Sequence, residues 1–565
     1  MSTSLSTMTI NMLPVMRELF QLQQSSSYPI SSDNASHFGI SSLSLSATGS
    51  SYSYSSNRTS PSLAFTPLTS LNYSALVQKV RAILDSGHTP EAYTDKLIRP
   101  FYNKLVLMQA TGFASQLRGP NKAPIESIAH AILQNFGDTT GEKVPRKNTE
   151  AIREVISDLY QKFLHTTCSH TPSAPCLQGP SPVPNWSQED LSTYPQKTLG
   201  SFGVGVSTVN IPFRYATKSA ITWGCLGHEV AGHDILGAYP NARNELQRSV
   251  TAALRNNQLS DTAFYWSNWF DETASDVLGV LNMGPAAAFS LIAFLRSLGA
   301  QNEDDFKLSA RGYINDEHPI DLLRGFLVAY VVQAMPVDRF SKGAEYAQLV
   351  MREVEKDATG INNLKFNTIV LGELNHLKDL LGDFLKKQRL QLEYPSSWDE
   401  PMQTAIALIN NEKLKDPFTK FLASEGLPQT RKSARLTENI HKMSMLHIPL
   451  VLDDFKRSAK IVAQTIMNQP LQALGGLSLS NIRCWNNGDE KIQVAFKKVL
   501  SGIEKIGNYS EGYFAAHVVS AAVIESISDT RSTPITQEKL EKVFGRMVSV
   551  LQSMHTTNPE WQQES

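Results

Sequence analysis

The residues best suited to chemistry lie in the segment 224–234, which contains the sequence HEVAGH. Its two histidines, His228 and His233, are five positions apart, and Glu229 directly follows the first of them. Neutral imidazoles bind zinc, and a carboxylate beside a zinc-bound water can accept a proton from that water. The motif therefore indicates a metal site with a general base beside it.

The spacing of the two histidines requires a distorted helix. In a regular α-helix, residues four apart point about 40° from each other, whereas residues five apart point about 140° from each other. One extra residue looped out as a π-bulge returns both rings to one face. Gly232 tolerates the backbone angles that such a bulge needs. We therefore expect a helix over residues 219–236 that contains a π-bulge.

A third ligand is expected from residues 268–279, NWFDETASDVLG, because catalytic zinc sites use three protein ligands and leave one position to water. Asn268 and Asp271 are interpreted as the N-cap of a helix and its capping-box partner. This register places Glu272 and Asp276 on one helix face. Glu272 can reach the metal, and Asp276 can accept the far N–H of a ligand histidine, which fixes its ring direction.

Together, the two segments resemble the zinc peptidases of the gluzincin type. HEVAGH is similar to the motif of the dipeptidyl peptidase III family, and DETASD loosely matches that family's second motif, E-E-x-x-A-E/D. ETASDVLG also resembles the third-ligand helix of thermolysin-type enzymes, E-x-x-S-D-x-x-G. The resemblance covers residues 225–236 and 268–284. It departs from dipeptidyl peptidase III at Asp271, where that family has Glu, and at Ala274, which replaces a basic residue.

The resemblance implies a zinc metallopeptidase with one Zn²⁺ per chain and a peptide or protein as its substrate. It implies His228, His233 and Glu272 as the metal ligands. Glu229 would be the general base, and Asp276 would support a ligand histidine. Two alternatives stay open at this point. One is a zinc hydrolase of a non-peptide amide or ester, and the other is a non-catalytic helical interaction protein with a vestigial motif.

A hydrogen-bond donor for the reaction is expected in residues 311–324, RGYINDEHPIDLLR. Pro319 suits the first turn of a helix, which would place His318 at the helix N-terminus. The helix dipole there disfavours the imidazolium, and a neutral ring could donate to the oxyanion that forms at a peptide carbonyl. Tyr265 and Tyr313 are alternative donors. A surface capping residue is the other interpretation of His318.

The whole chain has the composition of an ordinary globular protein, with 565 residues of which 41% are hydrophobic and 19% are charged. Its 52 basic and 53 acidic residues give a net charge of −1, so no nucleic-acid partner is expected. The longest apolar runs, near 285–295 and 326–335, are shorter than the roughly 20 residues that span a bilayer. No signal peptide is recognised, which favours the cytoplasm while leaving the compartment open.

The order of the elements predicts a mainly α fold. We expect a multi-helix, zincin-like catalytic core with a small β element, flanked by helical N- and C-terminal regions. The helical assignments rest on apolar residues that recur at helical spacing. Four regions are expected: a Ser-rich disordered segment over 1–67, a helical region over 68–195, the zinc-binding core over 196–338, and a helical domain over 339–565.

Three shorter segments within these regions have structural predictions of their own. Residues 8–22 have the spacing of a weak amphipathic helix. Residues 171–195 are rich in Pro and Ser and are interpreted as a long surface loop. Residues 202–213, FGVGVSTVNIPF, predict one or two strands. A strand just ahead of the zinc helix either pairs with an extended substrate through its edge or belongs to an internal hairpin.

Overall fold

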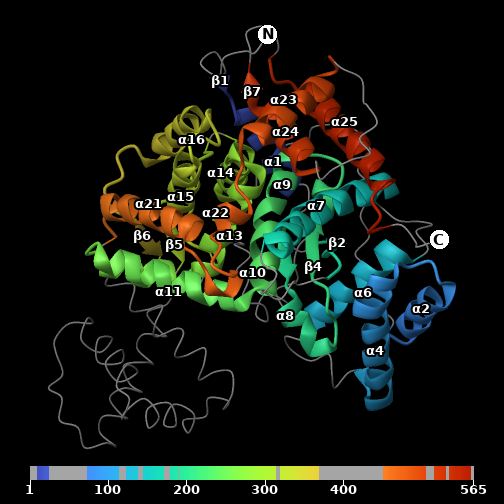
Figure 1. Ribbon diagram of the computed structural model, residues 1–565. Coiled ribbons are helices and arrows are strands. Elements are labelled where there is room, and N and C mark those ends of the chain that lie inside the picture. Colours follow the sequence, from blue (N-terminus) through green and yellow to red (C-terminus); the bar gives the residue numbers. More distant parts are fainter. Residues whose placement is uncertain are drawn as a thin grey trace, which may run out of the picture.

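Over the residues that it describes, the computed structural model is mainly helical with three small sheets, which confirms the predicted fold class (Figure 1). Among the helices it describes, none has the length and apolar character needed to cross a membrane. Apart from residues 9–24, the expected disordered segment over 1–67 lies outside the described residues. These are 9–24, 73–113, 122–137, 144–170, 179–188, 190–303, 305–313, 318–367, 450–503, 515–529 and 534–561.

The N-terminal segment is folded where it is described. β1 (Thr9–Ile10) pairs antiparallel with β7 (Ser528–Asp529), and α1 (Leu13–Gln24) packs on α14 (Pro285–Gly299). The apolar side of α1 is buried because its apolar residues recur at helical spacing. The weak amphipathic helix is therefore confirmed, and the expectation of disorder throughout 1–67 is wrong over residues 9–24.

A three-stranded sheet contributes the β element beside the histidine motif. Its strand order is β2-β4-β3, with β2 (Val183–Ser187) parallel and β3 (Ser192–Tyr194) antiparallel to β4 (Thr208–Pro212). β4 is the strand predicted in 202–213, but it is the central strand, so a substrate cannot pair with its edge. β3 lies at the edge and packs against the helix that carries the histidines.

Two of these strands, β2 and β3, lie in the segment 171–195 that was interpreted as a surface loop, so that interpretation is wrong over 183–187 and 192–194. All five residues of β2 are buried, and α6 (Lys122–Phe136) packs against the strand and bonds to its backbone through side chains. Gln134 donates to the Trp186 carbonyl and accepts from the Trp186 N–H, and Asn135 donates to the Pro184 carbonyl. A short strand with proline is thus stabilised by amide side chains from a distant helix, which no local pattern indicates.

The helices around the sheet form two hydrophobic cores. The smaller core gathers side chains from the segment 76–136 and from the start of the sheet, together with Trp561. The larger core runs from Ile10 to Met554. Helices of the smaller core and their neighbours are α2 (Tyr73–Ser86), α3 (Glu91–Tyr93), η2 (Thr94–Ile98), α4 (Arg99–Thr111), α8 (Gln196–Leu199) and η4 (Gly200–Phe202).

The expected region boundaries do not coincide with these two cores. The boundary at 195 falls inside the three-stranded sheet. The C-terminal helices pack into the same core as the central ones, so the boundary at 338 also falls inside one core. They are α16 (Gly343–Ala358), α21 (Leu452–Asn468), η8 (Gln472–Leu474), α22 (Leu479–Ile482), α23 (Asn487–Ser501), α24 (Ala515–Ile527) and α25 (Gln537–His555).

The central helices position the candidate site. The histidine-bearing helix packs between α7 (Arg146–His170) and α13, and α13 also packs against α15. β5 (Arg311–Tyr313) precedes α15 in the sequence and forms a two-stranded parallel sheet with β6 (Lys365–Asn367). The central helices are η5 (Phe213–Tyr215), α9 (Ala220–Gly224), η6 (Gly227–Asp234), α10 (Ile235–Ala238), α11 (Pro240–Asn256), α12 (Ser260–Asn268), α13 (Phe270–Met283) and α15 (Asp321–Ala334).

Candidate metal centre

The HEVAGH motif folds as a π-helix, η6, between α9 and α10. A π-helix joins residue i to residue i+5, so residues five apart lie one above the other on the same face. The rings of His228 and His233 accordingly face the same side, with their Nε2 atoms 3.1 Å apart. The predicted distortion is confirmed, and it extends over the whole motif.

Gly232 lies inside the π-helix and is required for close packing. It is absent from the glycines with positive φ. A Cβ at Gly232 would lie 2.4 Å from the Ser275 Cβ, and a Cβ at Gly279 would lie 3.1 Å from the Gly227 carbonyl carbon. Glycines on both helices thus let α13 approach η6 closely, which brings Glu272 within reach of the histidines.

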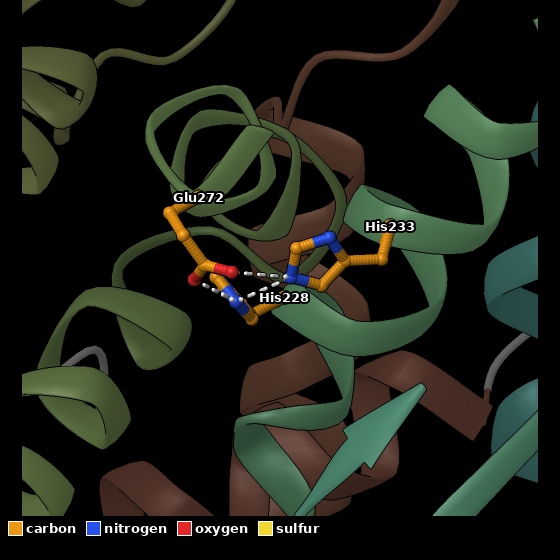
Figure 2. A group of neighbouring side chains, drawn as sticks. All are labelled: His228, His233 and Glu272. Carbon is orange, nitrogen blue, oxygen red and sulfur yellow. Dashed lines mark hydrogen bonds and ion pairs between the residues drawn. The ribbon is translucent and has the colours of Figure 1, made fainter. Parts of the chain in front are cut away.

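Three side chains converge where these helices meet (Figure 2). The Glu272 carboxylate lies between the two rings, with Oε2 3.2 Å from the Nε2 of His228 and Oε1 3.2 Å from the Nε2 of His233. A tetrahedral zinc ion with Zn–N bonds of about 2.0–2.1 Å holds its ligand atoms about 3.3 Å apart. The two imidazole nitrogens are spaced in this way, and so is each of them from the carboxylate oxygen nearest to it. One ligand atom from each of the three residues lies within 4.8 Å of the others, so the group could hold a metal ion.

The chemistry of the donors also fits a metal. Two histidines and one glutamate are a known ligand set of catalytic zinc sites, with a fourth position left for water. The Oε2 atom of Glu272 is buried, and its contact of 3.2 Å with the His228 Nε2 lacks hydrogen-bond geometry. A carboxylate oxygen in this position can serve as the ligand of a cation bound between the three side chains.

Asp276 lies behind these three side chains, at the position that the helix register predicted. Its Oδ1 accepts a hydrogen bond of 2.7 Å from the Nδ1 of His228, which leaves the Nε2 of that ring directed at the other two ligands. The Asp276 side chain is completely buried. It also accepts two hydrogen bonds of 2.8 Å from Arg324, one at each oxygen.

The charges at the centre oppose the effect of burial. Burial would raise the pKa of Glu272, but the charges of His318 and His233 hold it well below its usual value. Burial would also raise the pKa of Asp276, but the Arg324 guanidinium holds it below the ordinary range. Burial would lower the pKa of His228, but Asp276 and then Glu272 raise it to about 10. The two carboxylates and the His228 imidazole thus stabilise each other's charged forms.

Glu229, the proposed general base, is buried, with 7% of its surface exposed. Its Oε2 accepts a hydrogen bond of 2.9 Å from the Oγ1 of Thr193. Thr193 is in the edge strand β3, in the segment that was interpreted as a loop, so the sequence analysis missed it. The contact fixes one oxygen of the base against the sheet edge.

The expected cap of the ligand helix is wrong. α12 continues to Asn268, whose side chain donates back to the Phe264 carbonyl. α13 begins at Phe270 with Trp269 as its N-cap and no side-chain cap. Asp271 instead forms an ion pair with Arg243, at 2.6 Å. The two helices abut directly, so the first turn of α13 has no preceding extended residue that could act as a side-chain cap.

The candidate hydrogen-bond donors lie in different environments. His318 is half-exposed, and its Nε2 is 3.5 Å from the Oε2 of Glu272. The helix expected to start at Pro319 begins at Asp321, because Ile320 is its N-cap. Tyr265 is fully buried, and its hydroxyl accepts the Ile320 N–H at 2.8 Å, so it supports the chain just after His318. Tyr313 contributes its backbone to β5, and its side chain lies outside the described structure.

Arg324 is the second residue beside the candidate centre that the sequence analysis missed. It lies in the apolar helix α15, DLLRGFLVAYVVQA, with 3% of its surface exposed. Arginine is almost never fully buried unless it is paired. A lone cation inside an apolar helix was therefore a usable signal for a buried carboxylate partner, although it could not identify Asp276.

We compared the chain with known protein families, with curated proteins and with solved structures, and none of them matches it. No relative therefore supplies a function or a ligand for the residues described above. Function has to be inferred from the chemistry of the site itself.

Proposed function

We propose that this protein is a zinc-dependent metallopeptidase, with His228, His233 and Glu272 as the ligands of one Zn²⁺ ion per chain. The observation that carries the proposal is the convergence of these residues: the two Nε2 atoms are 3.1 Å apart, and each is 3.2 Å from one oxygen of the Glu272 carboxylate. Zinc held there would act as a Lewis acid and lower the pKa of a bound water toward about 7. The remaining steps belong to residues of the chain.

The proton transfers are assigned to Glu229. Thr193 holds the Oε2 atom of its carboxylate, and Oε1 is the atom proposed to take the proton from the attacking water. The same carboxyl group then delivers that proton to the leaving amine. Asp276 assists by holding the His228 Nδ1–H, so that this ring keeps the tautomer in which Nε2 is a ligand.

His318 is proposed to stabilise the charge that develops on the carbonyl oxygen. Its ring lies beside Glu272, and half of it is exposed, as a group that contacts substrate must be. An N–H donor aimed at that oxygen stabilises the transition state more than the ground state. Tyr265 is not proposed for this role because its hydroxyl is buried against Ile320.

An extended peptide is the proposed substrate because an edge strand adjoins the general base. β3 lies at the edge of its sheet, packs against η6, and contacts Glu229 through Thr193. Peptides add to such edges by main-chain hydrogen bonds. β4, which lies in the segment considered for this role in the sequence analysis, is the central strand, so β3 is proposed as the docking strand.

The test is digestion of a peptide library by the zinc-loaded protein, with Glu229→Gln as the matched control. The amide keeps the shape of the glutamate but cannot act as a base. Peptide cleavage should therefore fall by about 10²–10⁴-fold, while the zinc content stays at that of the wild type. Equal cleavage by both proteins would show that Glu229 is not the base. A zinc-loaded wild type that cleaves esters or small amides but no peptide would replace peptidase with another hydrolase.

A further inference from the structure

We infer that Arg324 is a positioning residue of the metal centre, which orients Asp276 and, through it, the ligand ring of His228. This inference rests on the proposed zinc site. Arg324 meets Asp276 with two nearly parallel hydrogen bonds, Nε to Oδ2 and Nη2 to Oδ1, both 2.8 Å long. A planar guanidinium in this arrangement fixes the plane of the carboxylate as well as its place.

The orientation matters because one oxygen of Asp276 serves two donors. Oδ1 accepts from Arg324 Nη2 and, at 2.7 Å, from His228 Nδ1. A rotation of the carboxylate would move Oδ1 out of line with the imidazole N–H. The ring of His228 would then be free to turn, and its Nε2 would move away from His233 and Glu272.

Stability does not account for this pair. Replacement of a buried ion pair by well-packed apolar side chains is often neutral or stabilising, and the rest of α15 is apolar. What only the ion pair supplies is an ionised and immobile acceptor for the His228 N–H. Arg324 Nη2 also lies 3.8 Å from Glu272 Oε2, so the same cation faces the ligand carboxylate.

The chain offers a matched control at the far end of α13. Arg483 also holds a buried aspartate, Asp489, with bonds of 2.8 and 3.1 Å, and that aspartate also accepts from a histidine, His517, at 2.7 Å. Arg483 further donates to the carbonyl of Asn282, near the end of α13. A lysine at this position loses the same planar fork in an equally buried setting, but its aspartate does not contact a metal ligand.

The first experiment measures zinc affinity by chelator competition in the full-length wild type, Arg324→Lys and Arg483→Lys. Lysine keeps the charge and loses the fork, so Arg324→Lys should bind zinc about tenfold more weakly or worse. Arg483→Lys should bind zinc as the wild type does. With cobalt in place of zinc, the visible absorption spectrum should change in Arg324→Lys only. Wild-type affinity in Arg324→Lys, or an equal loss in Arg483→Lys, would overturn the inference.

A second experiment uses a double variant designed so that no buried charge loses its partner and the protein still folds. Asp276→Asn combined with Arg324→Gln replaces the ion pair by two amides and leaves no unpaired buried charge. If Arg324 acts through Asp276, this double variant should bind zinc as weakly as Asp276→Asn alone and no more weakly. A further loss in the double variant would contradict the inference. A wild type that binds no zinc would instead overturn the proposed function.

Discussion

The metal centre and the far end of α13 contain the same three residue types in nearly the same arrangement. At the metal centre, Asp276 accepts from both Arg324 and His228. At the far end, Asp489 accepts from Arg483 and from a buried histidine. Both aspartates are buried, and both have a pKa that burial would raise but that the opposed cations and hydrogen bonds hold below the usual range.

The two sites differ in what lies on the far side of the histidine. His228 gives its Nδ1 to the aspartate, and its Nε2 faces two further donor groups. His517 gives its Nε2 to Asp489, and its ring packs beside Trp485, with the ring centroids 5.2 Å apart. Asp489 also accepts the Asn486 N–H in the capping box of α23. The same trio thus supports a proposed metal ligand at one end of α13 and caps a helix at the other.

The pKa values of the two histidines move in opposite directions. Burial lowers the pKa of His517, and Asp489 does not restore it. Burial also acts on His228, but two carboxylates, Asp276 and Glu272, raise its pKa to about 10. An excess of negative charge around His228 is what a cation site requires, and the His517 cluster lacks it.

The largest expected difference between the two clusters is in the effect of replacing their histidines. The purified protein should carry about one zinc per chain, and His228→Ala or His233→Ala should lose it because two remaining donors hold zinc weakly. His517→Ala should retain the metal, although it leaves Asp489 with one partner fewer. Elemental analysis after dialysis measures this. Full zinc retention when both motif histidines are replaced would rule out the site.

A smaller effect is expected at the aspartates. Asp276→Asn should weaken zinc binding by about 10–100-fold, because the His228 ring loses the acceptor that orients it. Asp489→Asn should leave zinc affinity unchanged and lower the thermal unfolding temperature instead, since it leaves Arg483 buried without its counter-charge. Chelator competition and thermal unfolding of both variants test this prediction. An equal loss of zinc affinity in the two variants would mean that the clusters do not differ as proposed.

The smallest expected effect concerns acid stability. Because the folded-state pKa of Asp489 lies below its unfolded value of about 3.9, its stabilisation is fully present above that pH. The stabilisation is lost as the pH falls from about 4 toward the folded-state pKa, by up to about 1.4 kcal/mol per pH unit. Asp489→Asn should therefore unfold with a shallower pH dependence below pH 4. Urea titrations from pH 5 to pH 2 measure it, and parallel curves for both proteins would contradict the assignment.

Some features of the site could be predicted because they depend on local periodicity. The spacing of His228 and His233 already required a π-turn, and η6 has one. The four-residue spacing of Glu272 and Asp276 placed both on one face of a helix, which α13 confirms. The mainly helical fold followed in the same way from apolar residues that recur at helical spacing.

Periodicity shows which face of an element is buried, but it does not show what that face is buried against. The cap expected at Asn268 failed because α12 continues into that position. β2 escaped prediction because its partners are β4 on one side and side chains of α6 on the other, all distant in the sequence.

The sequence by itself determined the two histidines, the glutamate and the helix distortion that brings their side chains to common faces, because these follow from residue type and spacing along one or two helices. Only the tertiary structure decided that Thr193 would hold the base and that Arg324, 48 residues beyond Asp276, would hold its carboxylate. Those contacts join elements that are distant in the chain. Burial of a charged side chain is favourable only when packing supplies its partner, so they could be recognised only once the helices were in place.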